Sequence, residues 1–96
     1  VGTLVFDEVD AGIGGSVAET IGKSLRTLGK ERQVLCVTHL PQVAANGNEH
    51  WSVTRSGVSV SVARLDRPAR IRELARMLGG SEVTARKHAA ELLDAG

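Results

Sequence analysis

The chain has 96 residues, of which 42% are hydrophobic and 24% are charged, and its formal net charge is +1. This length allows one domain at most and excludes a full-sized enzyme fold, because so short a chain buries only about two-thirds of its unfolded surface. No apolar run approaches the roughly 20 residues that a membrane-spanning helix needs. The single cysteine, Cys36, excludes an internal disulfide bond and suits a reducing cytosol.

The first third of the chain has the pattern of a βαβ unit. Residues 3–6 and 33–38 are largely apolar runs that predict two parallel strands, each buried on both faces. Between them, residues 16–28 show apolar side chains at helical spacing, with Ser16 as the predicted N-cap. The chain begins at Val1 rather than Met, just before the first strand, so we expect it to be a segment of a longer protein.

The spacing of apolar residues then changes. Residues 39–45 predict a short helix. Apolar and polar residues alternate over residues 51–55 and 58–63, and this pattern predicts a β-hairpin with one apolar face. We expect the turn at residues 56–57 and Trp51 packed into the core.

Two helices are predicted at the end of the chain. The first begins near Pro68 and ends before Gly79, and the second is capped by Ser81. Each carries an apolar stripe, formed by Ile71, Leu74, Ala75 and Leu78 in the first and by Ala85, Ala89, Leu92 and Leu93 in the second. The order of elements predicts an α/β fold, with a βαβ core, a β-hairpin and two C-terminal helices.

The residues that follow the first strand carry the clearest chemical pattern. An apolar strand that ends in Asp7 and Glu8 matches a Walker B motif, in which the first carboxylate holds Mg²⁺ and the second orients or activates water for attack on a γ-phosphate. Such a strand end, taken alone, is equally typical of an exposed acidic pair. His39 follows the second strand, and because neighbouring parallel strands share one carboxyl edge, we expect it near the acidic pair.

Two segments resemble a known family. Residues 4–15, LVFDEVDAGIGG, and residues 37–44, VTHLPQVA, are similar to the C-terminal part of RecN, a family of bacterial DNA repair proteins in the SMC-like branch of the ABC-type ATPases. The similarity continues through residues 73–80 and 88–93 and covers essentially the whole chain. Its most specific part is the DAGIGG stretch at residues 10–15.

The resemblance implies a role for each polar residue of these motifs. Asp7 would be the Walker B aspartate that holds Mg²⁺, and Glu8 would be the catalytic carboxylate that positions water. His39 would be the switch histidine that senses the γ-phosphate. Asp10 would belong to the D-loop, which reaches toward the nucleotide site of the partner head.

The resemblance also implies cofactors, partners and a location. ATP and Mg²⁺ would be the cofactors, and two heads would form a homodimer that sandwiches ATP. The partners would be DNA and the recombinase RecA, in double-strand-break repair and recombination. The protein would be cytoplasmic and nucleoid-associated, with no membrane partner.

Other parts of such a head are missing from the sequence. Residues 1–96 would form the C-terminal part of an ABC-type, P-loop ATPase head, but they hold no Walker A motif, no signature motif and no heptad segment for a coiled coil. The glycines of residues 12–15 are not a phosphate cradle, because no Lys-Ser/Thr pair follows at the required spacing. We therefore expect the full-length protein to be an ATPase and this segment alone to be inactive.

Two alternatives remain open at this point. The chain could be a non-catalytic module that dimerises or docks a partner, in which case Glu8 and His39 would tolerate substitution. It could also belong to the head of another SMC-like chromosome-maintenance ATPase, which the glycine-rich stretch after Asp10 would distinguish. Because a truncated sheet leaves an apolar face uncovered, we expect the isolated segment to self-associate.

The arginines of the second half are the last candidate site. Five of them lie close together in the sequence: Arg64, Arg67, Arg70, Arg72 and Arg76. They could contact DNA phosphates, which would make binding dependent on salt. Asp66 and Glu73 are interleaved with them, and this mixture favours a solvated helix face.

Overall fold

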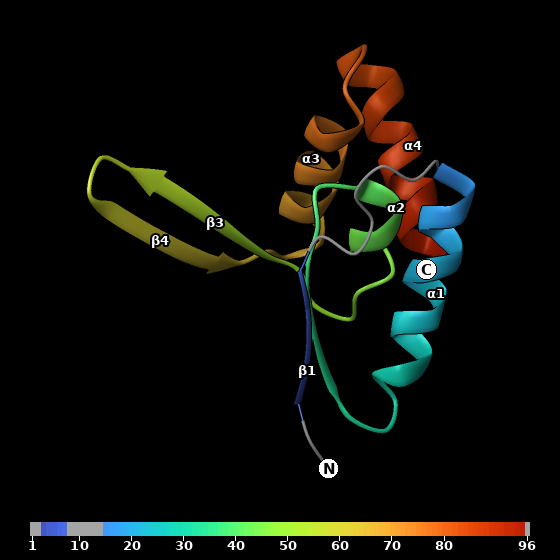
Figure 1. The fold of residues 1–96 in the computed structure, drawn as a ribbon. Helices are drawn as coiled ribbons and strands as arrows, with labels where there is room; N and C mark the ends of the chain where they lie inside the picture. The colour runs from blue at the N-terminus through green and yellow to red at the C-terminus, as the bar shows by residue number, and fades with distance from the viewer. Residues whose placement is uncertain (1–2, 8–14, 96) are drawn as a thin grey trace.

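The computed structural model describes residues 3–7 and 15–95 of the chain. In chain order, the described elements are β1 (Thr3–Asp7), α1 (Gly15–Leu28), β2 (Gln33–Val37), α2 (Pro41–Ala44), β3 (Trp51–Ser56), β4 (Ser59–Arg64), α3 (Arg67–Leu78) and α4 (Glu82–Ala95). The helices lie together, whereas the hairpin of β3 and β4 projects away from them (Figure 1). This order and mixture of elements confirms the predicted α/β class.

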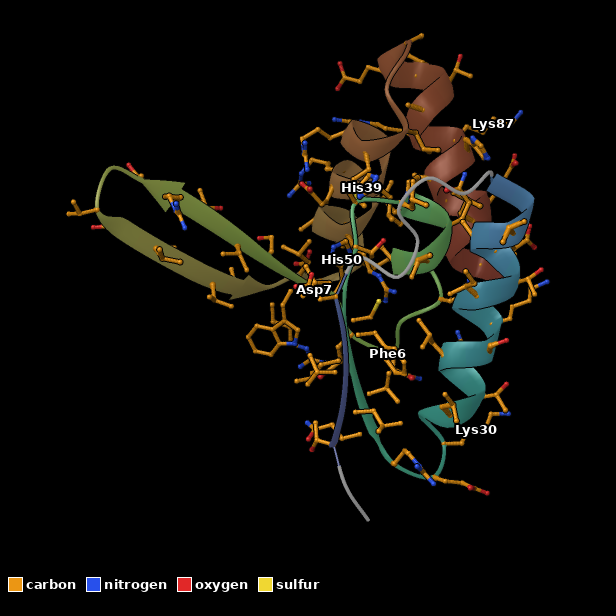
Figure 2. All side chains as sticks on the ribbon, in the orientation of Figure 1. Phe6, Asp7, Lys30, His39, His50 and Lys87 are labelled. Carbon is orange, nitrogen blue, oxygen red and sulfur yellow. The ribbon has the colours of Figure 1, made fainter. Side chains whose placement is uncertain are left out.

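β1 and β2 form a two-stranded parallel sheet, with Asp7 opposite Val37. Successive side chains of a strand point to opposite faces, and Phe6 is half-buried on the face toward α1 (Figure 2). On the other face, Val5 is 67% exposed and Leu35 is 51% exposed. The prediction that both strands are buried on both faces is therefore wrong for the described part of the chain, where no helix covers the outer face.

α1 and α2 pack closely because one residue of α1 has no side chain. A Cβ atom at Gly22 would lie 2.7 Å from Asn46 Nδ2 and 3.0 Å from the carbonyl oxygen of Gln42. Asn46 is 6% exposed, and its Nδ2 donates a hydrogen bond to that same carbonyl at 2.8 Å. Gly22 thus allows α1 to approach the turn that follows α2.

The core lies where α3 and α4 meet the end of α2. Its buried residues are Ala45, Leu74, Ala75, Ala85 and Ala89, and Ala44, Ile71, Met77, Leu78, Leu92 and Leu93 pack against them. These residues confirm both predicted apolar stripes. Asp66 caps α3 by accepting a hydrogen bond from the Ala69 backbone N–H at 3.0 Å, and Gly79 ends it with a φ of +76°, which glycine adopts without strain.

The hairpin is formed as predicted but is not buried. Ser56 pairs with Ser59, so the turn lies at residues 57–58, one residue later than predicted, and Gly57 supplies the positive φ that such turns need. Trp51 is 53% exposed, which makes the prediction that it packs into the core wrong. The physical reason is that β3 and β4 contact each other but no other described helix or strand.

Candidate functional site

The carboxyl ends of β1 and β2 bring two of the candidate residues to one edge of the sheet. The register runs in parallel from Thr3 opposite Gln33 to Asp7 opposite Val37, and His39 follows two residues later. Asp7 and His39 are both exposed (Figure 2). Glu8 and Asp10 lie outside the described residues.

His39 lies in the turn between the end of β2 and the start of α2. The backbone N–H of Leu40 donates a hydrogen bond to Thr38 Oγ1 at 3.0 Å, which bends the chain where the strand ends. α2 then begins at Pro41, whose ring suits the first turn of a helix and needs no hydrogen-bond acceptor. The histidine therefore lies on a short, locally ordered bend rather than on a long loop.

Arg70 of α3 binds the end of α2, and so joins the helix that follows His39 to the core. Its Nη2 donates hydrogen bonds to the carbonyl oxygens of Ala44 at 3.0 Å, Ala45 at 3.4 Å and Gly47 at 2.5 Å. The last carbonyls of a helix have no partner within the helix, and a cation there also opposes the helix dipole. Arg70 is thus a structural cation and not the solvated side chain that the sequence favoured.

Two titratable groups near Arg70, those of His50 and Glu73, have pKa values below their ordinary ones. Burial lowers the pKa of His50, the positive charge of Arg70 lowers it further, and the negative charge of Glu73 opposes both. His50 Nδ1 is buried and has no hydrogen-bond partner in the described part of the chain. A hydrogen bond from Arg76 holds the pKa of Glu73 below its usual range.

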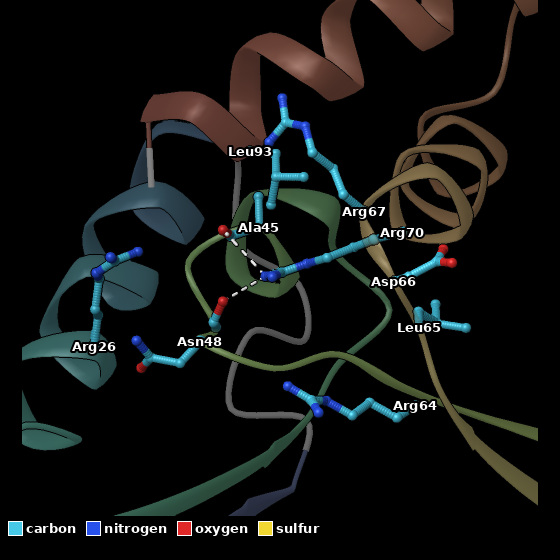
Figure 3. A pocket seen from close by; sticks show the side chains of 10 residues that line it. Arg26, Ala45, Asn48, Arg64, Leu65, Asp66, Arg67, Arg70 and Leu93 are labelled. Atoms are coloured by element: carbon cyan, nitrogen blue, oxygen red, sulfur yellow. Dashed lines mark hydrogen bonds between the residues drawn. The ribbon is translucent and has the colours of Figure 1, made fainter.

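A hollow of about 620 Å³ lies between the end of α2, the base of the hairpin and the helices (Figure 3). Four arginines are among the residues that line it, namely Arg26, Arg64, Arg67 and Arg70, and we call this hollow the arginine basin. Arg72 and Arg76 line a different hollow, so the five clustered arginines of the sequence do not form one surface. Arg26 was missed by the sequence analysis because it comes from α1, far from the others in the chain.

Two kinds of site have no support among the described residues. Within residues 3–7 and 15–95, no group of three His, Cys, Asp or Glu side chains could hold a metal ion. None of the described helices is long and apolar enough to cross a membrane.

Comparison with known proteins gives close relatives in sequence. No family model matches the chain. It is 53% identical over 94 residues to the DNA repair protein RecN of Xylella fastidiosa (strain Temecula1), a match that covers 94% of this chain and 17% of that protein. It is 51% identical over 104 residues to RecN of Streptomyces coelicolor, with 98% and 18% covered. The chain thus spans less than a fifth of the length of the curated relatives it matches.

The fold has a relative among solved structures as well. A structure from work on the ATP-driven dimerisation and DNA-stimulated activation of SMC ATPases matches with a TM-score of 0.74. The match covers 84% of this chain and 50% of that one at 17% identity, and it shows a shared fold. The chain belongs to the RecN family of DNA repair proteins.

Proposed function

We propose that this chain forms part of a head that binds and hydrolyses ATP in a RecN-family protein acting in DNA double-strand-break repair and recombination. The observation that carries the proposal is the parallel pairing of β1 with β2, since the end of β1 at Asp7 and the end of β2 before His39 then lie at one edge of the sheet. In open parallel sheets, ligands bind beyond the carboxyl ends of the strands. The fold shared with an SMC ATPase supports the same conclusion.

Asp7 has the properties of a magnesium ligand. Its carboxylate is exposed at the end of β1 and makes no hydrogen bond or ion pair with the rest of the described chain. Mg²⁺ takes oxygen ligands and is commonly held by one or two carboxylates together with water and substrate phosphates. When bound, the ion would offset the negative charge that develops on the phosphates.

The remaining candidate residues would have different roles in ATP hydrolysis and assembly. Glu8, next to Asp7, would orient the attacking water and accept its proton. His39, at the bend after β2, would donate a hydrogen bond to the γ-phosphate. Asp10 would reach the nucleotide site of the second head in a homodimer. DNA and RecA would be the partners of the assembled protein, at the nucleoid in the cytoplasm.

The rest of the head would have to come from outside this chain. The sequence holds no Walker A motif to cradle the phosphates, and the outer face of the sheet is uncovered in the described residues. An exposed apolar face next to Asp7 suits a sheet that is covered by another part of the protein. We expect residues 1–96 alone to neither bind ATP tightly nor hydrolyse it.

The test of this proposal is ATP hydrolysis by a full-length RecN-family protein that carries this sequence. Glu8→Gln is expected to lower the Mg²⁺-dependent rate by at least ~100-fold and to leave ATP binding intact, because it removes the proton acceptor alone. Glu19→Gln is the matched control, since Glu19 is an exposed acid of α1 paired with Lys23. An unchanged rate in Glu8→Gln would refute the catalytic role.

One observation favours a second function, that of a docking or dimerisation module without catalysis. Val5, Leu35 and Val37 form an exposed apolar strip on the outer face of the sheet. If substitution of Glu8 and of His39 leaves ATP hydrolysis and DNA repair unchanged, this second function replaces the first.

A further inference from the structure

The arginine basin gathers positive charge from three elements, of which α1 is distant in the sequence from β4 and α3. Arg26 comes from α1, Arg64 from the end of β4, and Arg67 and Arg70 from the first turn of α3. Figure 3 shows Arg26, Arg64 and Arg70 on different sides of the hollow. Neither Asp7 nor His39 is among the described residues that line this hollow.

The charge of the basin is only partly offset. Among the described residues, one carboxylate, that of Asp66, lines it with the four guanidinium groups, and this carboxylate already accepts the capping hydrogen bond from Ala69. Arg64 pairs with Glu49 at 3.0 Å, and Arg67 pairs with Asp94 at 2.7 Å. All four paired side chains are at least half exposed, and such ion pairs contribute little and exchange readily for another anion.

The guanidinium groups are also close enough to act on one another. Burial lowers the pKa of Arg70, and the positive charges of Arg26 and Arg67 lower it further. Three hydrogen bonds to backbone carbonyls hold Arg70 in place, so it is a fixed charge at the floor of the basin. Within the described part of the chain, the Arg26 guanidinium makes only a long contact of 3.5 Å to the Asn46 carbonyl, which leaves it available.

The chemistry of this lining selects phosphate. The planar guanidinium fork binds phosphate oxygens through two parallel hydrogen bonds, and several such groups spread over one open hollow suit successive phosphates of a strand better than one compact anion. No aromatic side chain is among the described residues that line the hollow, so none is placed there to stack on a base. Recognition would therefore be of the backbone and independent of base sequence.

We propose that the arginine basin binds the phosphodiester backbone of DNA. The proposal rests on the DNA-binding part of the proposed function and assigns that part to named residues. The substitutions that test it differ from those that test ATP hydrolysis, because neither Asp7 nor His39 is among the described residues that line the basin.

The test uses a full-length RecN-family protein that carries this sequence, and a fluorescent duplex oligonucleotide. Arg26→Gln, Arg64→Gln and Arg67→Gln are combined, while Arg70 is kept for its structural bonds. The matched control combines Arg55→Gln, Arg72→Gln and Arg86→Gln, which removes the same charge from exposed positions outside the basin. Fluorescence anisotropy is measured over a range of salt concentrations.

The triple basin variant is expected to bind the duplex at least about tenfold more weakly than the control, with a salt slope smaller by roughly three, about one for each lost phosphate contact. Circular dichroism shows whether the triple variant folds. If it does not, Arg64→Gln alone replaces it, because the Arg64 side chain is 63% exposed. The salt slope of DNA binding should then fall by about one. Basin variants that match the control in affinity and slope would overturn the proposal.

Two further results separate the possible failures. Inorganic tripolyphosphate should compete with the duplex for the wild-type protein. If instead it binds at the basin while the basin variants keep full DNA affinity, the basin is a small-anion site and the proposal fails. If the unsubstituted protein binds no DNA at all, the DNA-binding part of the proposed function fails as well, and the basin proposal falls with it.

Discussion

The helices and the strands of this chain bury their apolar side chains to very different degrees. Between α3 and α4, Leu74 and Ala89 are both 0% exposed. On the strands, Val37 is 58% exposed, Val53 is 69% exposed and the hairpin residue Val60 is 57% exposed. Both regions are rich in apolar residues, so composition does not explain the difference.

The difference lies in where each region finds its packing partner. α3 and α4 follow each other after a short link and close on each other and on α2. Among the described elements, the parallel sheet contacts only α1, and the hairpin contacts no other helix or strand. The helical part can therefore form a core from this chain alone. The strands instead expose apolar side chains, as a sheet does when another part of a protein covers it.

The largest effect that this comparison predicts is at the centre of the helical core. Leu74→Ala removes a fully buried side chain and leaves a cavity, which should lower the free energy of unfolding by about 3 kcal/mol. Urea unfolding followed by circular dichroism of the helices measures this loss. Val83→Ala is the control, because Val83 is 81% exposed on α4 and should cost less than about 0.5 kcal/mol.

Equal losses in the two variants would show that the helices do not form a packed core in solution. The contrast between the two regions would then disappear, because neither would be stable on its own.

The helical core could be predicted from the sequence because its signals are local. The spacing of Leu74, Ala75, Ala85 and Ala89 marks the buried faces, and Gly79 marks the end of α3. The hairpin and the parallel order of β1 and β2 followed from the same kind of local pattern. Each of these features depends on residues that lie a few positions apart.

The features that could not be predicted depend on contacts between distant parts of the chain. Nothing in the neighbourhood of Arg26 links it to Arg64, yet both line the arginine basin. Arg70 looked like one of several charges on a helix face, whereas it binds carbonyls at the end of α2 and just after it. The exposure of Trp51 was also missed, because an alternating strand shows which side is apolar and not what covers it.

A second prediction concerns the uncovered face of the sheet. Val5→Thr combined with Val37→Thr keeps the β-branched shape and removes apolar surface from side chains that are 67% and 58% exposed. Self-association of the isolated chain should weaken by about tenfold or more, equivalent to roughly 1.4 kcal/mol, while its unfolding changes little. Sedimentation equilibrium measures the association.

Val83→Thr is the matched control for this pair, since Val83 is an exposed valine on the helical side. If both variants associate as strongly as the wild type, the sheet face is not the surface that joins the copies. In that case the exposed apolar side chains of the sheet would not contribute to self-association of the chain.

The smallest predicted effect is a pH dependence of the stability of the fold, which arises at His50, between the two regions. Its pKa in the folded chain is lowered by burial and then by Arg70, so the unfolded chain takes up a proton at a higher pH than the folded chain does. The stability contributed by the neutral histidine is complete above the ordinary value of about 6.5 and is lost as the pH falls through the lower folded pKa. Unfolding at pH 5.5 should therefore need less urea than at pH 7.5.

The same measurement on His50→Gln separates this histidine from other groups. The difference between pH 7.5 and pH 5.5 should shrink in His50→Gln and persist in the control His88→Gln, in which an exposed histidine of α4 is lost. Glu73 does not interfere, because its lowered pKa affects stability only as the pH falls below about 4.5. A pH difference that survives in His50→Gln would place the titrating group elsewhere and would show that Arg70 and the base of the hairpin do not enclose His50 in solution.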